Sequence, residues 1–254
     1  MGSAGNKLDP DDVRSLFRPL GYTGPNFADY QEAEQMLVDA IYENMLQKAL
    51  RAGKKDLVIV TGTPASGKST AARELNLWKA GLIYDAALTE EGRLEEVITN
   101  AQKAGMEKIT VVPVFNDVLT CYKNAINRGK RTWRYTALDY MINSFRSSIG
   151  KVEKLQRDFP EVEIIPVDCS HNQGVHKVSI EDAIKWNYDV TEEEMNALFT
   201  YLLSEINDGQ IEASSVPAAT GNILSIPGMT EQNTALAKQI DKRVQEIIKE
   251  YQLR

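Results

Sequence analysis

A glycine-rich stretch with one lysine and one serine has the spacing of a phosphate-binding loop. Gly62, Gly67, Lys68 and Ser69 match the pattern G-x-x-x-x-G-K-[ST]. An apolar, β-branched run at 57–60 precedes them and a helix-forming run follows, which is the context that the pattern requires. Glycines allow the turns that point several N–H groups at a phosphate chain, and the helix N-terminus adds partial positive charge. An ordinary glycine turn is the alternative, but strand, loop, lysine and serine together favour phosphate binding.

The chemistry that follows from such a loop is Mg²⁺-dependent chemistry on ATP. We expect Lys68 to reach the β- and γ-phosphates and the Ser69 hydroxyl to hold Mg²⁺. ATP and Mg²⁺ are therefore the predicted cofactors. The predicted nucleotide-binding residues are Gly62, Thr63, Pro64, Ala65, Ser66, Gly67, Lys68, Ser69 and Thr70.

An aspartate follows the next apolar run. Residues 82–84 predict a short strand, and Asp85 stands at its carboxyl end. In a doubly wound sheet, ligands bind outside the carboxyl ends of the strands. A carboxylate there accepts a proton from a substrate hydroxyl or helps to hold Mg²⁺ through water, and the alternative is an aspartate that only shapes a turn. Asp117 and Asp168 also follow predicted strands, and helix capping is the simpler role for Asp117.

The most basic run of the chain supplies the positive charge that phosphoryl transfer needs. It spans residues 128–134, and Arg128, Arg131 and Arg134 are the candidates for a phosphate contact. Their spacing does not settle which of them makes it. No acidic residue lies between 118 and 138, which favours a lid that closes over the γ-phosphate over a solvated basic loop.

The cysteines and histidines give a weaker signal. Cys169, His171 and His176 lie close in sequence, but their spacing fits no structural zinc pattern, so a metal site is disfavoured. Cys121 and Cys169 are far apart, which suits a reducing compartment without structural disulfides.

Composition limits the remaining classes. The 254 residues are 43% hydrophobic and 26% charged, which is ordinary for a soluble globular protein. The net charge of −7 disfavours nucleic acid as a partner, because binding would need a local basic patch. No apolar run approaches membrane-spanning length and no secretory signal opens the chain, so we expect a cytoplasmic protein without membrane contact. Residues 1–6 resemble a remnant of an expression tag.

The remaining elements alternate between strand and helix patterns. Strands are predicted at 57–60, 82–85, 109–115 and 162–167, with helices at 10–17, 29–52, 191–206 and 230–251 and others between the strands. This alternation predicts an α/β fold with a mostly parallel sheet and helices on both faces, plus a helical C-terminal extension. Pro113 donates no ladder hydrogen bond, so its strand is expected at an edge or with a bulge. A capping box at 191–194 and Asp9 ahead of Pro10 mark two helix starts.

At this point the residues resemble the zeta-toxin-like branch of the P-loop kinases. The resemblance rests on the phosphate loop, the Tyr84-Asp85 strand end, the strand at 109–115 with its Asn-Asp turn, and the arginine segment at 127–134. It spans roughly residues 21–170. The chain departs from the family in lacking a Gly-Arg-x-Val-Pro run in that segment, and in having Asn143 where a histidine is frequent.

The resemblance implies a P-loop kinase-like fold and an ATP-dependent transfer to a hydroxyl of a small nucleotide-containing metabolite, such as UDP-N-acetylglucosamine or NAD. It implies Asp85 as the base, Lys68 and Ser69 as phosphate and Mg²⁺ ligands, and arginines of 128–134 as the clamp. Some members are toxins held inactive by a cognate antitoxin. The division implied is an N-terminal helix and loop (1–28), the kinase domain (29–190) and a helical extension packed on it (191–254).

Three other classes compete with this interpretation. A regulatory GTPase would need an N-K-x-D motif after the phosphate loop, and the only match, at residues 6–9, lies ahead of it. A polynucleotide 5′-kinase would need a basic channel, which the acidic total charge disfavours. The third is another P-loop NTPase or a module that binds ATP without catalysis.

Overall fold

The computed structural model describes residues 5–22, 29–170 and 174–252. The chain groups into two compact units, Met1–Asn116 with Gly150–Asn187, and Asp117–Ile149 with Tyr188–Arg254. This grouping differs from the expected division at 28 and 190. The stretch at 117–149 groups with the C-terminal helices, because its two helices bury their apolar sides against them. Residues 7–8 belong to the sheet and not to a separate N-terminal part.

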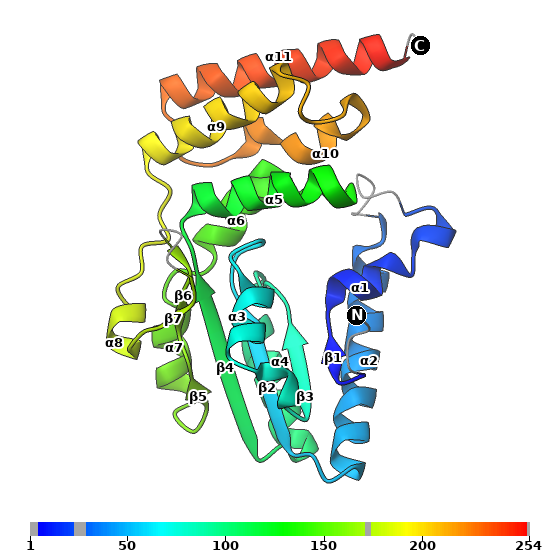
Figure 1. The fold of residues 1–254 in the computed structure, drawn as a ribbon, viewed down its shortest axis with the longest axis vertical. Coiled ribbons are helices and arrows are strands. Elements are labelled where there is room, and N and C mark those ends of the chain that lie inside the picture. Colours follow the sequence, from blue (N-terminus) through cyan, green and yellow to red (C-terminus); the bar gives the residue numbers. More distant parts are fainter. Residues whose placement is uncertain (1–4, 23–28, 171–173, 253–254) are drawn as a thin grey trace. The chain divides into compact units, whose positions relative to one another are not determined.

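The first unit is built on a mostly parallel sheet (Figure 1). Its order is β1-β3-β2-β4-β6-β7, with β5 also paired to β4, and among the described strands only β6 and β7 pair antiparallel. The strands are β1 (Lys7–Leu8), β2 (Asp56–Thr61), β3 (Leu82–Asp85), β4 (Lys108–Phe115), β5 (Glu163–Ile164), β6 (Val167–Asp168) and β7 (His176–Lys177).

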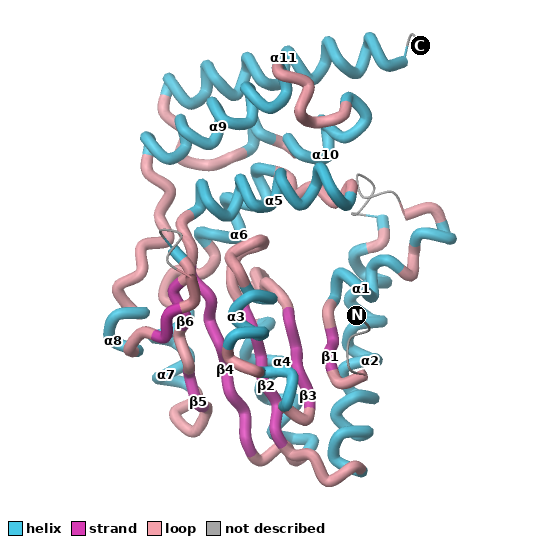
Figure 2. Tube along the Cα trace, viewed as in Figure 1, coloured by secondary structure: helices cyan, strands magenta, loops and turns pink. Residues whose placement is uncertain are grey.

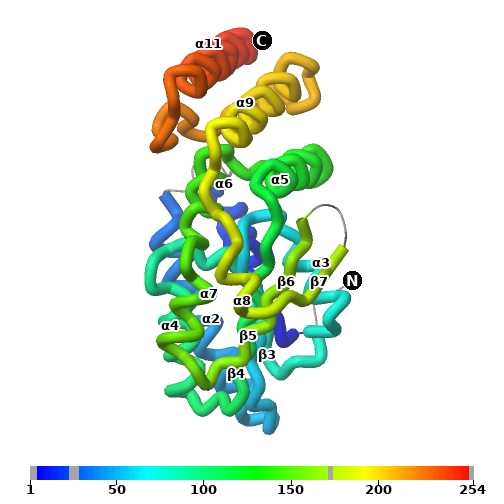
Figure 3. The backbone as a smooth tube through the Cα atoms, turned by 90° about the vertical axis from the view of Figure 1, so that its left-hand side faces the viewer, coloured from blue at the N-terminus to red at the C-terminus, as the bar shows by residue number. Residues whose placement is uncertain are grey.

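Helices cover both faces of this sheet, as predicted. Along β2, Leu57 and Ile59 join one buried cluster, whereas Val58 and Val60 join another, because successive side chains of a strand point to opposite faces. The first cluster includes residues of α2 (Gln31–Arg51), α4 (Arg93–Ala104) and α7 (Lys151–Asp158), and the second includes α3 (Lys68–Glu74). Figure 3 shows α4 and α7 on one side of the strands and α3 on the other. Each fully buried leucine or isoleucine contributes about 1.5–3 kcal/mol.

The prediction for Pro113 was wrong, because β4 is a central strand. It pairs with β2 on one side and with β5 and β6 on the other. The carbonyls of Val111 and Phe115 accept hydrogen bonds from the β5–β6 side, at 2.9 Å each. Alternation turns the missing N–H of Pro113 to that same side, between the last β5 pairing at Val111 and the first β6 pairing at Val114. The proline therefore sits where the neighbouring strand is interrupted, and no ladder bond is lost.

The N-terminal segment from Asn6 onward is part of the fold. The side-chain amide of Asn6 donates to the Ala80 carbonyl at 2.6 Å, and the backbone carbonyl of Asn6 accepts from the Ile83 amide at 2.8 Å. These bonds bring β1 alongside β3. Helix α1 (Pro10–Ser15) follows, capped by the Asp9 side chain as predicted. Residues 1–4 lie outside the described part.

The second unit contains helices and no strand among its described residues (Figure 2). Its helices are α5 (Val118–Thr132), α6 (Leu138–Arg146), α9 (Glu192–Asn207), α10 (Val216–Thr220) and α11 (Glu231–Gln252), while the short α8 (Ile180–Ala183) belongs to the first unit. The predicted capping box at Thr191 and Glu194 is present. Asn233 of α11 is fully buried and donates to the Asn196 side chain at 2.7 Å, which fixes α11 against α9.

Candidate phosphate-binding site

The loop between β2 and α3 has the strained backbone of a phosphate cradle. Gly62, Ala65 and Gly67 all have positive φ, at 143°, 60° and 108°. A methyl group on Gly62 would lie 2.3 Å from the Val114 carbonyl oxygen, so only glycine fits there. Three positive φ angles between residues 62 and 67 suit a loop that turns N–H groups toward an anion.

The polar side chains of the loop point into it. The Lys68 ammonium donates to the carbonyls of Gly62 and Thr63, at 2.9 and 3.1 Å, and so folds back across the loop. The Ser66 hydroxyl is fully buried and has no hydrogen-bond partner among the residues that the structure describes. A buried hydroxyl without a partner costs about 1–3 kcal/mol, and a phosphate oxygen in the loop would provide one.

Two side chains that follow strands β4 and β6 lie close to the loop. Asn116, which follows β4 and is buried, donates to the Ser66 carbonyl at 3.3 Å. The Cys169 sulfur, after β6, would lie 3.2 Å from a methyl group on Gly67. Sequence reasoning missed both roles, and the position of each at the carboxyl end of a strand was the available signal.

Asp85 ends the strand next to the one that leads into the loop. Val60 of β2 is its register partner, and the Ala86 amide donates to the Val60 carbonyl at 3.1 Å. The following residues are fixed as well, since the Thr61 hydroxyl donates to the Ala87 carbonyl at 2.9 Å and the Lys151 ammonium donates to that of Leu88 at 2.6 Å. Asp85 is therefore a buried carboxylate on a rigid strand end beside the phosphate loop.

Sequence reasoning missed that Asp85 is ion-paired. The Lys7 ammonium of β1 lies 2.8 Å from one carboxylate oxygen of Asp85 and 3.0 Å from one of Asp9. Residues 6–9 carry the N-K-x-D match that a GTPase would use for guanine. Here Lys7 and Asp9 belong to a three-residue charge cluster with Asp85. The signal available in the sequence was a lysine within a short strand pattern.

Burial and charge act against each other in this cluster. Burial alone lowers the pKa of Lys7, but the carboxylates of Asp85 and Asp9 outweigh it and raise that pKa. Burial raises the pKa of Asp9. The Lys7 ammonium lowers that pKa, but repulsion from the Asp85 carboxylate offsets part of this effect, so the pKa stays raised. Folding thus favours the charged form of Lys7 and disfavours that of Asp9, because two carboxylates share one ammonium.

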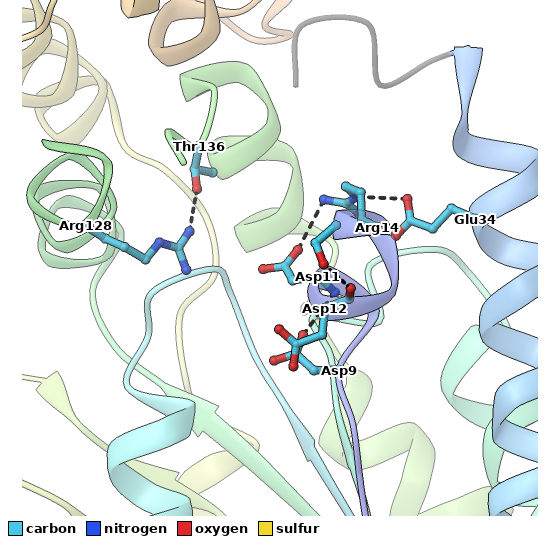
Figure 4. A network of polar contacts seen from close by, with 8 residues as sticks. Asp9, Asp11, Asp12, Arg14, Glu34, Arg128 and Thr136 are labelled. Carbon is cyan, nitrogen blue, oxygen red and sulfur yellow. Dashed lines mark hydrogen bonds and ion pairs between the residues drawn. The ribbon is translucent and has the colours of Figure 1, made fainter. Parts of the chain in front are cut away.

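Helix α1 anchors this cluster to α2. Arg14 makes two parallel hydrogen bonds to the carboxylate of Glu34, at 2.8 and 2.9 Å, and a third to Asp11 at 3.2 Å. Figure 4 shows Arg14 reaching between these two carboxylates, with Asp9 at the start of the same helix. Paired guanidinium–carboxylate bonds of this kind hold their partners in a fixed geometry.

The arginine segment belongs to the second unit and is mostly helical. Arg128 and Arg131 lie on the last turns of α5, and Arg134 follows the helix end. Arg128 donates to the Thr136 hydroxyl at 3.0 Å (Figure 4), and Arg131 donates to the carbonyl of Asn127. The segment was expected to be a lid with no acidic residue to neutralise it. It is instead helical as far as Thr132, and the absence of a neutralising acid needs correction.

The correction comes from a distant part of the chain. Lys130 forms an ion pair with Glu205 of α9 in the same unit. No neighbour in the sequence neutralises Lys130, but the fold brings the carboxylate of Glu205 to it from a distant helix. The role of Arg128, Arg131 and Arg134 on phosphate stays a prediction.

The other carboxylate and metal candidates have local roles. Asp117 accepts from the Thr120 amide at 2.7 Å and caps α5, as predicted. Asp168 accepts from the Ser170 amide at 2.7 Å in a turn. His171 lies outside the described residues, and within the described part no group of three or more His, Cys, Asp and Glu side chains is placed to hold a metal ion.

The residues of the loop fit the groups that the sequence predicts. Three features of the loop suit a chain of phosphates: its positive φ angles, the Ser66 hydroxyl, which lacks a partner in the described part of the chain, and the Lys68 ammonium. Ser69 stands on the first turn of α3 and is exposed. Mg²⁺ in nucleotide sites takes few protein oxygens besides water and phosphate, so one hydroxyl at this position is a suitable donor set.

Alkylation of Cys169 offers a first prediction. Burial, with the charges of Asp168 and Glu74, raises the pKa of its thiol from 9.0 to about 11. Because only the thiolate reacts, labelling by iodoacetamide at pH 8 should be about 100-fold slower than for a thiol of pKa 9, and should accelerate up to about pH 11. Mass spectrometry of timed samples measures this rate. Cys121 is fully buried, so a Cys169→Ser variant should remain unlabelled, and fast labelling of Cys169 at pH 8 would contradict the burial.

Comparison with known proteins gives only a distant likeness. No family model and no curated protein matches this chain. Three matching chains come from crystal structures of the complex AvrRxo1-ORF1:AvrRxo1-ORF2. The structure with sulphate ions gives 12% identity over 82% of this chain and 88% of that one, with a TM-score of 0.47. The native complex gives 10% identity over 93% of this chain and 90% of that one, with a TM-score of 0.45. The complex with ATP gives 12% identity over 95% of this chain and 96% of that one, with a TM-score of 0.46.

Likeness at this level does not carry a reaction from one chain to another. Functional inference therefore rests on this chain's own residues. In its described part, none of the helices combines the length and the apolar character needed to cross a bilayer.

Proposed function

We propose that this chain is an ATP-dependent kinase that transfers the γ-phosphate to a hydroxyl of a small nucleotide-containing metabolite. The observation that carries the proposal is the pairing of a phosphate loop with a buried aspartate at the end of the adjacent strand, through the register of Val60 with Asp85. A buried carboxylate at this position supplies the base that a kinase needs for the acceptor hydroxyl. The acceptor class, with UDP-N-acetylglucosamine and NAD as examples, comes from the resemblance to zeta-toxin-like kinases.

The candidate residues of the phosphate loop and Asp85 each have a defined task in this reaction. Lys68 leaves the loop carbonyls and binds the β- and γ-phosphates, while the loop amides and the Ser66 hydroxyl hold the triphosphate in line. The oxygen of the acceptor hydroxyl bonds to the γ-phosphorus, and Asp85 accepts the proton that this hydroxyl loses. The bond from that phosphorus to the β–γ bridging oxygen breaks, and ADP leaves with the electron pair. Mg²⁺, held by Ser69 and phosphate oxygens, supplies charge neutralisation when bound.

Incubation with γ-labelled ATP, Mg²⁺ and a panel of sugar nucleotides, dinucleotides and oligonucleotides tests the proposal. Label should move to a sugar nucleotide or a dinucleotide. Label on oligonucleotides would instead identify a polynucleotide 5′-kinase. Label found only as free phosphate across the panel would remove the kinase assignment.

Replacing Asp85 separates a kinase from a binder of ATP. In Asp85→Asn we expect transfer to fall by about 10²–10⁴-fold, because the acceptor loses its base, while ATP affinity stays within about threefold. Titration calorimetry and the labelled-phosphate assay measure the two quantities. Asp158→Asn is the matched control, since Asp158 is an exposed carboxylate whose ion pair with Arg157 is on the surface. Equal transfer by Asp85→Asn and wild type would exclude Asp85 as the base.

A neutralising partner protein is part of this proposal only through the resemblance. If the product is toxic, expression of the chain should arrest growth of a bacterial host, and Asp85→Asn should relieve the arrest. Growth that is equal for both proteins would remove the toxin assignment without affecting the kinase assignment.

A further inference from the structure

We propose that Lys7 is a positioning residue for Asp85, holding one carboxylate oxygen so that the other faces the acceptor hydroxyl. The inference rests on the proposed kinase function and names a further residue for it. Lys7 lies outside the segment that carries the family resemblance, which spans roughly residues 21–170.

The contact is built into the sheet. Lys7 is the register partner of Ile83, and Leu8 is that of Tyr84, so β1 runs parallel to β3 and ends beside Asp85. The side chain of Leu8 is buried in the core cluster that includes α2 and α4. Lys7, one residue earlier, points to the opposite face, where its ammonium lies 5.8 Å from the centre of the Trp78 ring. A lysine whose side chain is only 12% exposed is thus directed along the sheet to Asp85.

The ammonium is itself held from the other side. One oxygen of Asp9 accepts from Lys7 at 3.0 Å, and the other accepts from the Asp11 amide, also at 3.0 Å, at the start of α1. Helix α1 is tied to α2 through Arg14 and Glu34. The position of the Lys7 ammonium is therefore fixed by groups that are fixed in turn, as precise orientation of a reacting carboxylate requires.

Charge balance argues against a purely structural ion pair. A pair that served only to attach β1 would be balanced, or would be replaced by apolar side chains at little cost. The cluster instead sets two carboxylates, the buried one of Asp85 and the quarter-exposed one of Asp9, against one ammonium. The Asp11 amide offsets part of the charge of Asp9, which leaves Asp85 as the buried carboxylate that depends on Lys7.

Removal of the ammonium without change in length tests the inference. In Lys7→Met, the rate constant kcat for transfer from γ-labelled ATP to the acceptor found in the panel should fall about 30–100-fold, with KM for ATP unchanged. Asp9→Asn, which removes only the second anchor, should lower kcat about 3–10-fold and keeps the test decisive if Lys7→Met does not fold. Lys55→Met is the matched control, because Lys55 forms an exposed ion pair with Glu107 and kcat should stay at the wild-type value.

Chemical restoration completes the test. Lys7→Cys in a Cys169→Ser background, alkylated with 2-bromoethylamine, regains an ammonium on a side chain of nearly the same length. It should recover at least about a third of the kcat of the Cys169→Ser protein itself. If wild type transfers phosphate and both Lys7→Met and Asp9→Asn do so equally well, the inference fails and the proposed function stands. A faster Lys7→Met would show that Lys7 masks Asp85, which also overturns it. If wild type transfers no label, the proposed function fails and takes this inference with it.

Discussion

ATP binding should weaken about 10–100-fold when Lys68 is replaced with methionine, and phosphoryl transfer should fall further. The ammonium exchanges its bonds to the carbonyls of Gly62 and Thr63 for bonds to phosphate. Hydrogen bonds to charged groups contribute about 1.5–3 kcal/mol each, and every 1.4 kcal/mol is tenfold in affinity. Charge that develops on the transferring phosphoryl group adds a further loss in rate of about 10²–10³-fold.

Titration calorimetry with ATP and Mg²⁺ measures the first loss, and the labelled-phosphate assay measures the second. Lys103→Met is the matched control, because Lys103 is an exposed lysine of α4 and its loss should change neither quantity. ATP affinity that survives in Lys68→Met would mean that the loop between β2 and α3 is not the nucleotide site, and the proposed function would then lose its basis.

The sequence predicted the elements that local chemistry determines. The loop at 62–69, the aspartate at a strand end and the helix starts at Asp9 and Thr191 follow from residue type and spacing over a few positions, and the structure has each element there. The two-sided sheet followed from alternation along the strands. Each of these signals is carried by residues close together in the chain.

What sequence reasoning missed depends on pairs far apart in the chain. Lys7 meets Asp85, and Lys130 meets Glu205, only after the sheet and the helices have formed. The strand of Pro113 was expected at an edge or with a bulge, because the interruption between β5 and β6 beside it has no sequence pattern of its own. Charge near in sequence was a poor guide to charge near in space.

Gly62→Ala should destroy the nucleotide site more completely than any loss of a side chain. The alanine methyl group would lie 2.3 Å from the Val114 carbonyl oxygen, and the backbone angle φ is +143°. Positive φ costs a residue with a side chain about 1–2 kcal/mol, and overpacking costs about 1–3 kcal/mol. Val114 cannot yield, because it is buried in β4 and paired with Val167, so the loop must move instead.

A displaced loop no longer turns its amides toward phosphate, so we expect ATP binding below detection and a free energy of unfolding lower by about 2–5 kcal/mol, the sum of both costs. Calorimetry and urea unfolding measure the two effects. Gly92→Ala separates strain from collision, because Gly92 also has positive φ, +78°, but nothing within 4 Å of the added methyl group. That control should lose about 1–2 kcal/mol and keep its affinity for ATP. A Gly62→Ala protein that still binds ATP tightly would show that the cradle tolerates a side chain, and the loop geometry would not be what holds the phosphates.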